Sequence, residues 1–201
     1  MTEHYYTKGP NVKHAEKKWT FLIYGREFVF NSDSGVFSKN TVDFGSRTLL
    51  DACEQLEFPV GRLLDLGCGY GPLGLALAYR FPKRQVDMSD INERALNLAH
   101  KNAVDNGLEN VSIFNSDVYS AVTRTDYAAI VTNPPIRAGK TVVHAMLAGA
   151  YEHLRAGGIL TAVIQKKQGA PSAQKKMTQV FGNCTVILKR KGYFILKSVK
   201  N

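Results

Sequence analysis

Short apolar runs alternate with stretches of helical period along most of this 201-residue chain. The runs have the length and composition of buried strands, and the stretches between them repeat apolar residues at helical spacing. Strands that alternate with helices predict a parallel sheet with helices on both faces. The predicted strands are 63–66, 86–90, 111 to about 117, 127–132 and 159–164, and the predicted helices between them are 73–81, 93–106 and 141–154.

The N-terminal end departs from this alternation. Residues 1–18 are polar and predict a loosely held arm, whereas residues 19–30 predict two short strands. Ser46 is the predicted N-cap of the helix that precedes the first strand of the sheet. Because 201 residues suit one domain, we expect a single domain, with an arm and β extension over 1–44 and a core over 45–201.

The C-terminal end predicts a hairpin. A basic loop over 166–175 opens a short helix that ends near Gly182. Two apolar runs, 186–188 and 193–196, then flank Lys191-Gly192, a turn signal. The hairpin places at least one antiparallel strand at an edge of the otherwise parallel sheet.

A glycine-rich segment follows the first predicted strand of the sheet. Residues 63–74 read Leu-Leu-Asp-Leu-Gly-Cys-Gly-Tyr-Gly-Pro-Leu-Gly, which predicts a strand, a tight turn and a helix. Such a turn lets a ligand approach bare backbone at the positive end of a helix. Asp65 would repel a pyrophosphate, which disfavours NAD and FAD, and would attract the cationic S-adenosylmethionine. The predicted contacts here are Asp65, Gly67, Gly69 and Gly71.

Polar residues stand at the ends of further predicted strands, where open α/β sheets bind their ligands. Asp90 follows Asp65 by 25 residues, close to the spacing at which an acid binds ribose hydroxyls in dinucleotide folds. Asp117 could accept from an adenine amino group. The alternatives are a helix-capping role for Asp90 and an ordinary loop position for Asp117. Their neighbours Ile91 and Val118 complete the predicted cofactor site.

Asn133-Pro134-Pro135-Ile136 follows the fourth strand and predicts the chemistry. Two prolines fix the backbone and remove two N–H donors, which leaves the carbonyls of Asn133 and Pro134 to accept hydrogen bonds. An exocyclic amine is a poor nucleophile because its lone pair is delocalised. Acceptors that hold its hydrogens would turn the lone pair toward a methyl group. We therefore predict that residues 133–136 are catalytic and that Asn133 also contacts the cofactor.

These motifs resemble known families. Residues 65–71 resemble the first motif of the Rossmann-like methyltransferases that use S-adenosylmethionine, and Asn133-Pro134-Pro135 resembles the motif of those that modify amino nitrogens. Residues 133–140, with 35–38 and Asp43, are similar to the ribosomal RNA small-subunit methyltransferase C family, which makes N2-methylguanine. The resemblance implies a seven-stranded Rossmann-like fold, S-adenosylmethionine as cofactor, and ribose and adenine roles for the acids at strand ends.

Two departures from that family affect the substrate site. Ile136 stands where amino-nitrogen methyltransferases carry an aromatic residue, so another ring, with Phe37 a candidate, is expected to stack on the base. The family's longer members have two methyltransferase-like halves, and this chain matches only the catalytic one. The predicted substrate contacts are Phe37, Arg137, Lys140, Lys166 and Lys167.

The charge distribution and the cysteine content indicate which classes of partner and which compartment suit this protein. The net charge is +9, and no Asp or Glu occurs after Glu152. This asymmetry favours a polyanionic partner, RNA, over a merely solvated basic face. Three widely spaced cysteines, with no pair of metal-ligand spacing, suggest a reducing cytoplasm and no metal. No apolar stretch is long enough to span a membrane.

The leading hypothesis is a cytoplasmic methyltransferase that acts on guanine N2 of ribosomal RNA, with a role in rRNA processing. A protein glutamine N5-methyltransferase and a non-catalytic RNA-binding module are the alternatives. The basic, acid-free stretch after Glu152 disfavours the first, and the intact Asp65, glycines and Asn133 disfavour the second. Gly139-Lys140-Thr141 imitates the end of a phosphate loop, but Pro134 stands where its first glycine would be, which excludes that motif.

Overall fold

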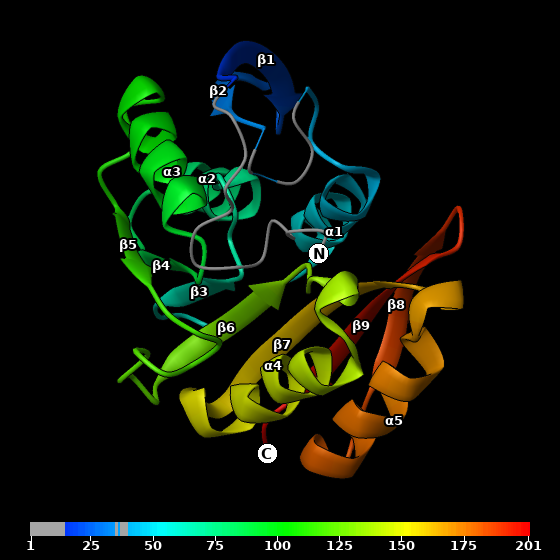
Figure 1. Cartoon of the computed structure of the whole chain (residues 1–201). Helices are drawn as coiled ribbons and strands as arrows, with labels where there is room; N and C mark the ends of the chain where they lie inside the picture. Colours follow the sequence, from blue (N-terminus) through cyan, green and yellow to red (C-terminus); the bar gives the residue numbers. More distant parts are fainter. Residues whose placement is uncertain (1–14, 35, 37–39) are drawn as a thin grey trace.

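The computed structural model describes residues 15–34, 36 and 40–201. Its strands form a seven-stranded sheet and a separate two-stranded sheet (Figure 1). The strands are β1 (Lys17–Ile23), β2 (Arg26–Ser32), β3 (Leu63–Leu66), β4 (Val86–Asp90), β5 (Val111–Asn115), β6 (Tyr127–Thr132), β7 (Leu154–Gln165), β8 (Thr185–Arg190) and β9 (Tyr193–Val199). The helices are α1 (Phe44–Gln55), α2 (Pro72–Arg80), α3 (Glu93–Asp105), α4 (Lys140–His153) and α5 (Ala170–Phe181), with 3-10 turns η1 (Ile136–Ala138) and η2 (Lys166–Gln168).

The large sheet has the order β5-β4-β3-β6-β7-β9-β8. Strands β5 to β7 pair in parallel, whereas β9 runs antiparallel to both β7 and β8. The chain order reverses between β3 and β6, which is where doubly wound sheets form their ligand crevice. The predicted Rossmann-like sheet is therefore confirmed, with the detail that β9 inserts beside β7 and leaves β8 at the edge.

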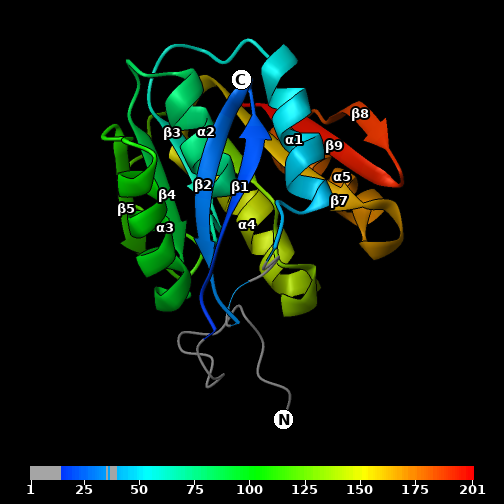
Figure 2. The ribbon, with the colours of Figure 1, turned by 90° about the horizontal axis from the view of Figure 1, so that it is seen from above.

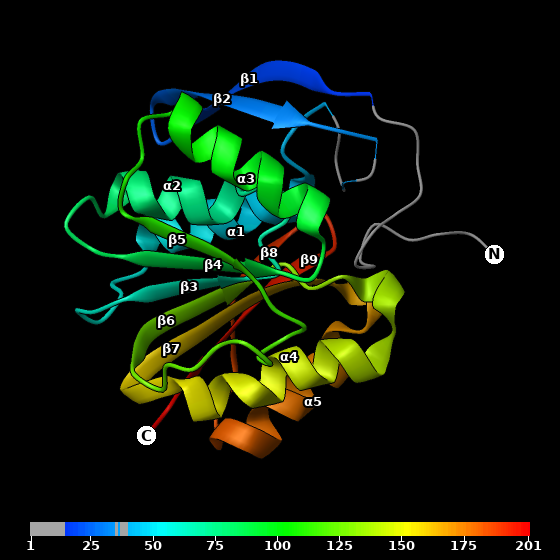
Figure 3. The ribbon, with the colours of Figure 1, turned by 60° about the vertical axis from the view of Figure 1, so that its left-hand side comes forward.

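Helices cover both faces of this sheet, as predicted. One apolar core lies between the sheet and helices α1, α2 and α3, and a second lies between the sheet and helices α4 and α5 (Figures 1 and 3). In β3 the side chains alternate between them, so that Leu63 faces the first core while Leu64 and Leu66 face the second. Within the described residues, no helix has the length and apolar character needed to cross a membrane.

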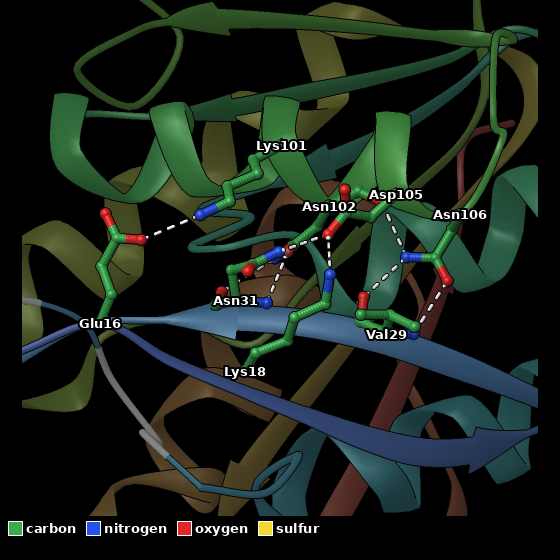
Figure 4. Close-up of polar contacts among 8 residues, drawn as sticks. All are labelled: Glu16, Lys18, Val29, Asn31, Lys101, Asn102, Asp105 and Asn106. Carbon is green, nitrogen blue, oxygen red and sulfur yellow. Dashed lines mark hydrogen bonds and ion pairs between the residues drawn. The ribbon is translucent and has the colours of Figure 1, made fainter.

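The β1–β2 hairpin packs outside helices α2 and α3, away from the large sheet (Figures 2 and 3). Amide side chains of α3 join it to the body of the molecule (Figure 4). The Oδ1 atom of Asn102 accepts from the backbone N of Asn31 at 2.6 Å, and the Nδ2 atom of Asn106 donates to the carbonyl of Val29 at 2.7 Å. The polar side chains of α3 thereby replace strand partners that the hairpin's inner edge lacks.

Three element boundaries differ from the sequence prediction. Helix α1 is capped by Asp43, which accepts from the backbone N of Gly45 and Ser46, and not by Ser46 itself. Strand β7 begins at Leu154 rather than at residue 159, because it continues through an irregularity in its pairing with β6. Helix α5 begins at Ala170, so part of the predicted basic loop is helical. Each difference arises from a contact distant in sequence or from local bending, and the hydrophobic pattern of the sequence predicts neither.

Candidate active site

A cavity of about 440 Å³ lies at the carboxyl ends of β3, β4, β6 and β7. This volume is within the range of small-molecule sites in proteins. Most of the predicted cofactor and catalytic residues line it. They are Gly67, Gly69, Asp90, Ile91, Asp117, Val118, Asn133, Pro134, Pro135 and Ile136.

The glycine turn after β3 forms one wall of the cavity. Gly67 and Gly69 have φ of 75° and 57°, in the left-handed region that suits glycine. The backbone N of Gly67 donates to the carbonyl of Ser89 at 2.8 Å, and that of Gly69 donates to Oδ2 of Asp90 at 2.8 Å. These two bonds bind the turn to the end of β4. Gly71 does not line the cavity, because it caps α2 with φ of 102°.

Asp65 lies behind the turn and does not line the cavity. Its side chain is fully buried, and Oδ2 accepts from the backbone N of Gly74 at 2.7 Å. Burial raises the pKa of this carboxyl to about 7, although the bond from Gly74 opposes the shift. Its other oxygen, Oδ1, has no hydrogen-bond partner among the described residues. Asp65 therefore holds the start of α2 against β3, behind the glycine turn that lines the cavity.

Asp90 stands at the end of β4 with its carboxylate already partly engaged. Besides the bond from Gly69, its Oδ1 accepts from the backbone N of Asn92 at 2.9 Å. Burial raises the pKa of Asp90. Asn92 is the N-cap of α3, as predicted, and Asp90 lies next to this cap. Each carboxylate oxygen retains a lone pair for a further donor, such as a ribose hydroxyl.

A strained residue lies at the far wall of the cavity, beyond β5. Val118 has φ of 51°, which is rare for a β-branched residue. The hydroxyl of Ser116 donates to the carbonyl of Val118 at 2.9 Å, and the backbone N of Asp117 donates to Oγ of Ser120 at 3.1 Å. These bonds hold the turn so that Val118 and Asp117 face the cavity. Strain of this kind gathers at functional sites.

Asn133 is held by residues from α1. Its Nδ2 atom lies 3.2 Å and 3.3 Å from the two carboxylate oxygens of Asp43 and 3.0 Å from Oγ of Ser46. The hydroxyl of Thr132 donates to the carbonyl of Leu66 at 2.8 Å, which joins the ends of β6 and β3. The catalytic turn and the glycine turn are therefore fixed to each other at one edge of the sheet.

The predicted substrate residues are less closely grouped. Arg137 lines the cavity and is exposed. Lys140, Lys166 and Lys167 are exposed at the same end of the sheet but do not line the cavity. Phe37, the predicted stacking ring, falls outside the described residues. The structure thus places Arg137 in the cavity wall, whereas the three lysines lie outside the cavity at the same end of the sheet.

Two polar residues from the C-terminal half of the sheet are among the cavity residues that the sequence reasoning missed. Gln165 and Tyr193 are cross-strand partners at the end of the β7–β9 pair, and both line the cavity. The ring of Tyr193 lies 5.5 Å from that of Phe44, at 52° to it. The predicted hairpin contained Tyr193, but periodicity gave no sign that β9 would insert beside β7. The ring of Tyr193 thereby lines the cavity next to the carboxyl end of β7.

The donor set suits a ribonucleoside that carries a cationic tail. Asp90 offers acceptors to a diol, Ile91 and Val118 offer apolar contact to a base, and the glycine turn allows close approach of the ligand to the backbone. Among the described residues that line the cavity, Arg137 is the only lysine or arginine, and it follows β6 rather than the glycine turn. Among the described residues, no group of three His, Cys, Asp or Glu side chains is arranged to hold a metal ion.

Comparisons with known proteins agree with this geometry. The family model described as "Methyltransferase small domain" matches residues 27–197. A Bacillus subtilis (strain 168) relative named "Uncharacterized protein YbxB" is 52% identical over 201 residues, which are 100% of both chains. The ribosomal RNA small subunit methyltransferase C of Vibrio vulnificus (strain CMCP6) is 32% identical over 188 residues, which are 92% of this chain and 53% of that protein.

Among the solved structures that are similar over most of the chain, one has an rRNA methyltransferase in its description. It is a T. thermophilus 16S rRNA N2 methyltransferase in complex with AdoMet and guanosine, with a TM-score of 0.83 and 30% identity. The match covers 96% of this chain and 52% of that chain. The chain therefore spans about half the length of these two rRNA methyltransferases, whereas it spans all of the Bacillus protein.

Proposed function

The chain belongs to the methyltransferase small domain family, and we propose that it methylates an exocyclic amine, N2 of a guanine in ribosomal RNA, with S-adenosylmethionine as cofactor. The observation that carries the proposal is the shared cavity of the glycine turn and the Asn133-Pro134-Pro135 turn. A cofactor held by the first turn and an amine held by the second meet in one enclosed space.

Residues of this chain account for cofactor binding. Asp90 would accept from the ribose hydroxyls and Asp117 from the adenine amino group, and Ile91 and Val118 would offer apolar contact, since all four line the cavity. Gly67 and Gly69 admit the methionine part to the backbone, while Asp65 supports the turn from behind through its bond to Gly74. S-adenosylmethionine supplies, when bound, a methyl group on a sulfonium centre.

Asn133 and Pro134 act on the amine. The side-chain oxygen of Asn133 and the carbonyl of Pro134 accept from the two hydrogens of the amine, so that the nitrogen lone pair turns toward the methyl group. Pro135 lacks an N–H and cannot compete for these acceptors. The cofactor would supply the methyl group from its S–C bond, and the amine nitrogen that these acceptors orient would gain the N–C bond and give up one proton to solvent. Positioning supplies most of the rate in this scheme.

The substrate assignment rests on chemistry and on the relatives. The Vibrio and T. thermophilus proteins carry rRNA methylation in their names, and the latter was solved with guanosine. The acid-free C-terminal stretch after Glu152 provides cations for a phosphate backbone. Arg137 at the cavity and Tyr193 at its substrate end provide contacts for a base that has left its stack.

The test compares RNA nucleosides from cells with and without the gene by mass spectrometry. We expect N2-methylguanosine of ribosomal RNA to decrease without the gene, to return with the wild-type gene and to stay low with Asn133→Ala. Loss of a methylated glutamine in protein, with unchanged RNA, would instead favour the glutamine amide as substrate. An unchanged methylation pattern in both RNA and protein would contradict the proposed activity.

A further inference from the structure

The polarity of the Asn133 amide is determined by its neighbours. A carboxylate can only accept hydrogen bonds, so the side-chain group that contacts both oxygens of Asp43 must be the NH2 of the amide. Ser46 lies 3.0 Å from the same nitrogen. The reversed orientation would place the carbonyl oxygen of Asn133 against a carboxylate, which is repulsive. The donors of Asn133 are therefore engaged with α1.

The same contacts leave one group of the amide for a ligand. The amide oxygen Oδ1 lies on the other side of Cγ from Nδ2, and Asn133 lines the cavity. With Nδ2 held by Asp43 and Ser46, Oδ1 is the atom available to a donor in the cavity. An acceptor at this position suits an amine substrate, whereas a donor there would repel its hydrogens.

Asp43 is itself fixed by the start of α1. Its Oδ1 accepts from the backbone N of Gly45 at 2.9 Å and of Ser46 at 3.1 Å. A side chain at Gly45 would crowd this carboxylate, because a Cβ there would lie 3.0 Å from Oδ1 of Asp43 and 3.2 Å from the ring of Tyr193. The helix start, with glycine at that position, therefore aims the carboxylate at Asn133.

We propose that Asp43 is a positioning residue that locks the amide of Asn133 with its oxygen toward the substrate amine. The inference rests on the proposed function and deepens it, because it names the residue, 90 positions away in sequence, that sets the hydrogen-bond polarity of the catalytic turn. Asp43 also lines the cavity, but in this scheme its carboxylate is occupied by the start of α1 and by the amide of Asn133. It acts through Asn133.

Asp43→Asn is the sharpest single test. Asparagine caps helices as well as aspartate does, so α1 is expected to keep its start. The new amide offers its oxygen to the backbone N of Gly45 and Ser46 and its NH2 to Asn133. Asn133 must then turn its own oxygen toward residue 43 and present its NH2 to the substrate. We expect kcat to fall about 100-fold, the range seen when a preorganised polar group is lost, with S-adenosylmethionine affinity nearly unchanged.

A reciprocal exchange separates positioning from structure. In the double variant Asp43→Asn/Asn133→Asp, the NH2 of residue 43 donates to one carboxylate oxygen of residue 133, and the other oxygen faces the amine as an acceptor. We expect this variant to recover at least about tenfold of the kcat lost in Asp43→Asn. Asn133→Asp alone places two carboxylates together and is expected to be less active than the double variant.

Asp51→Asn is the matched control. Asp51 lies on the same helix, has a half-exposed side chain, and pairs with Arg190 away from the cavity. The same chemical change there is expected to leave kcat and KM unchanged. Turnover is measured as transfer of tritium from labelled S-adenosylmethionine to total ribosomal RNA from cells that lack the gene, and cofactor affinity is measured by calorimetry.

The outcomes distinguish this inference from the proposed function. A wild-type chain that binds S-adenosylmethionine but labels no RNA overturns the proposed function and the positioning role with it. An active wild type whose Asp43→Asn variant keeps its kcat overturns the positioning role alone. A double variant no better than Asp43→Asn also overturns it, because a purely structural role for Asp43 predicts no recovery. A large fall in kcat with recovery in the double variant supports it.

Discussion

Two residues near the cavity have features that destabilise the folded state: one has a strained backbone, and the other has a buried carboxyl group. Val118 holds a left-handed backbone at the cavity wall, and Asp65 holds a carboxyl in an apolar layer beneath the glycine turn. Each feature costs stability and each lies beside a proposed cofactor contact. Both costs are measurable on single variants.

Val118→Gly is expected to stabilise the protein and weaken its cofactor binding. Glycine adopts φ of 51° without strain, so the free energy of unfolding should rise by about 1 kcal/mol, net of glycine's larger entropy in the unfolded chain. Loss of the side chain should lower S-adenosylmethionine affinity. Urea unfolding and calorimetry measure the two effects. Val60→Gly, at an exposed position without positive φ, should only destabilise, and equal losses in both variants would contradict the strain argument.

Asp65 makes stability depend on pH. Its pKa in the folded chain, about 7, lies above the value of about 4 expected in the unfolded chain. The folded state therefore binds this proton more tightly, and the stability that it contributes is present below about pH 4 and lost as pH rises through 7. Relative to Asp65→Asn, the wild type should lose up to about 1.4 kcal/mol per pH unit within that window. Parallel pH profiles in urea unfolding would contradict this.

At the scale of elements, the N-terminal hairpin and the glycine turn share one side chain. Asn102 of α3 is fully buried; its Nδ2 donates to the carbonyl of Asn31 in β2 at 3.1 Å and to that of Tyr70 in the glycine turn at 2.9 Å. The rings of Trp19 and Phe30 pack on Tyr70 from the hairpin side. The hairpin is therefore a support for the cofactor turn as well as a cover for the helices.

Asn102→Ala should destabilise the protein by about 3 kcal/mol, because it leaves several buried backbone groups of Asn31 and Tyr70 without partners. Lys101→Ala removes the neighbouring side chain, which forms an exposed ion pair with Glu16 (Figure 4). That control should cost about 0.5 kcal/mol or less. Urea unfolding compares the two variants, and similar small losses would show that the hairpin contact is dispensable.

At the scale of the molecule, positive charge and the cavity share one end of the sheet. Lys166 and Lys167 follow β7 at the edge where Asn133 follows β6. Lys83 and Arg155 are also exposed but lie at the opposite edge, near the starts of β4 and β7. The two pairs of cations therefore test whether charge position, rather than total charge, determines RNA binding.

Lys166→Glu/Lys167→Glu should weaken RNA binding, reduce its salt dependence by roughly 0.7 to 0.9 log units per log unit of salt for each lost contact, and leave cofactor binding intact. Lys83→Glu/Arg155→Glu makes the same change in net charge and should have the smaller effect. Fluorescence anisotropy with a single-stranded ribosomal RNA fragment measures both. Equal effects would indicate general attraction, and insensitivity to salt would indicate that the basic stretch after Glu152 binds no RNA.

Local chemistry made much of this protein predictable from its sequence. The strand–glycine turn–helix unit, the Asn92 cap and the C-terminal hairpin follow from periodicity and from the backbone needs of Gly and Pro, and the structure confirms them. The family resemblance, drawn from residues 65–71 and 133–140, is confirmed by the family model and the relatives. These features depend on neighbours within a few residues along the chain.

Only the tertiary structure determined which side chains meet. Spacing placed Asp65 next to the glycines, but strand alternation and the packing of α2 turn it away from the cavity. Asp43 and Ser46 are both polar residues at the start of α1. In the structure Asp43 is the N-cap, and the hydroxyl of Ser46 accepts a hydrogen bond from Asn133 at the end of β6. Tyr193 reaches the cavity because β9 inserts beside β7. The physical reason is common to all three: each contact joins segments whose relative placement is decided by sheet order and helix packing, which no local pattern encodes.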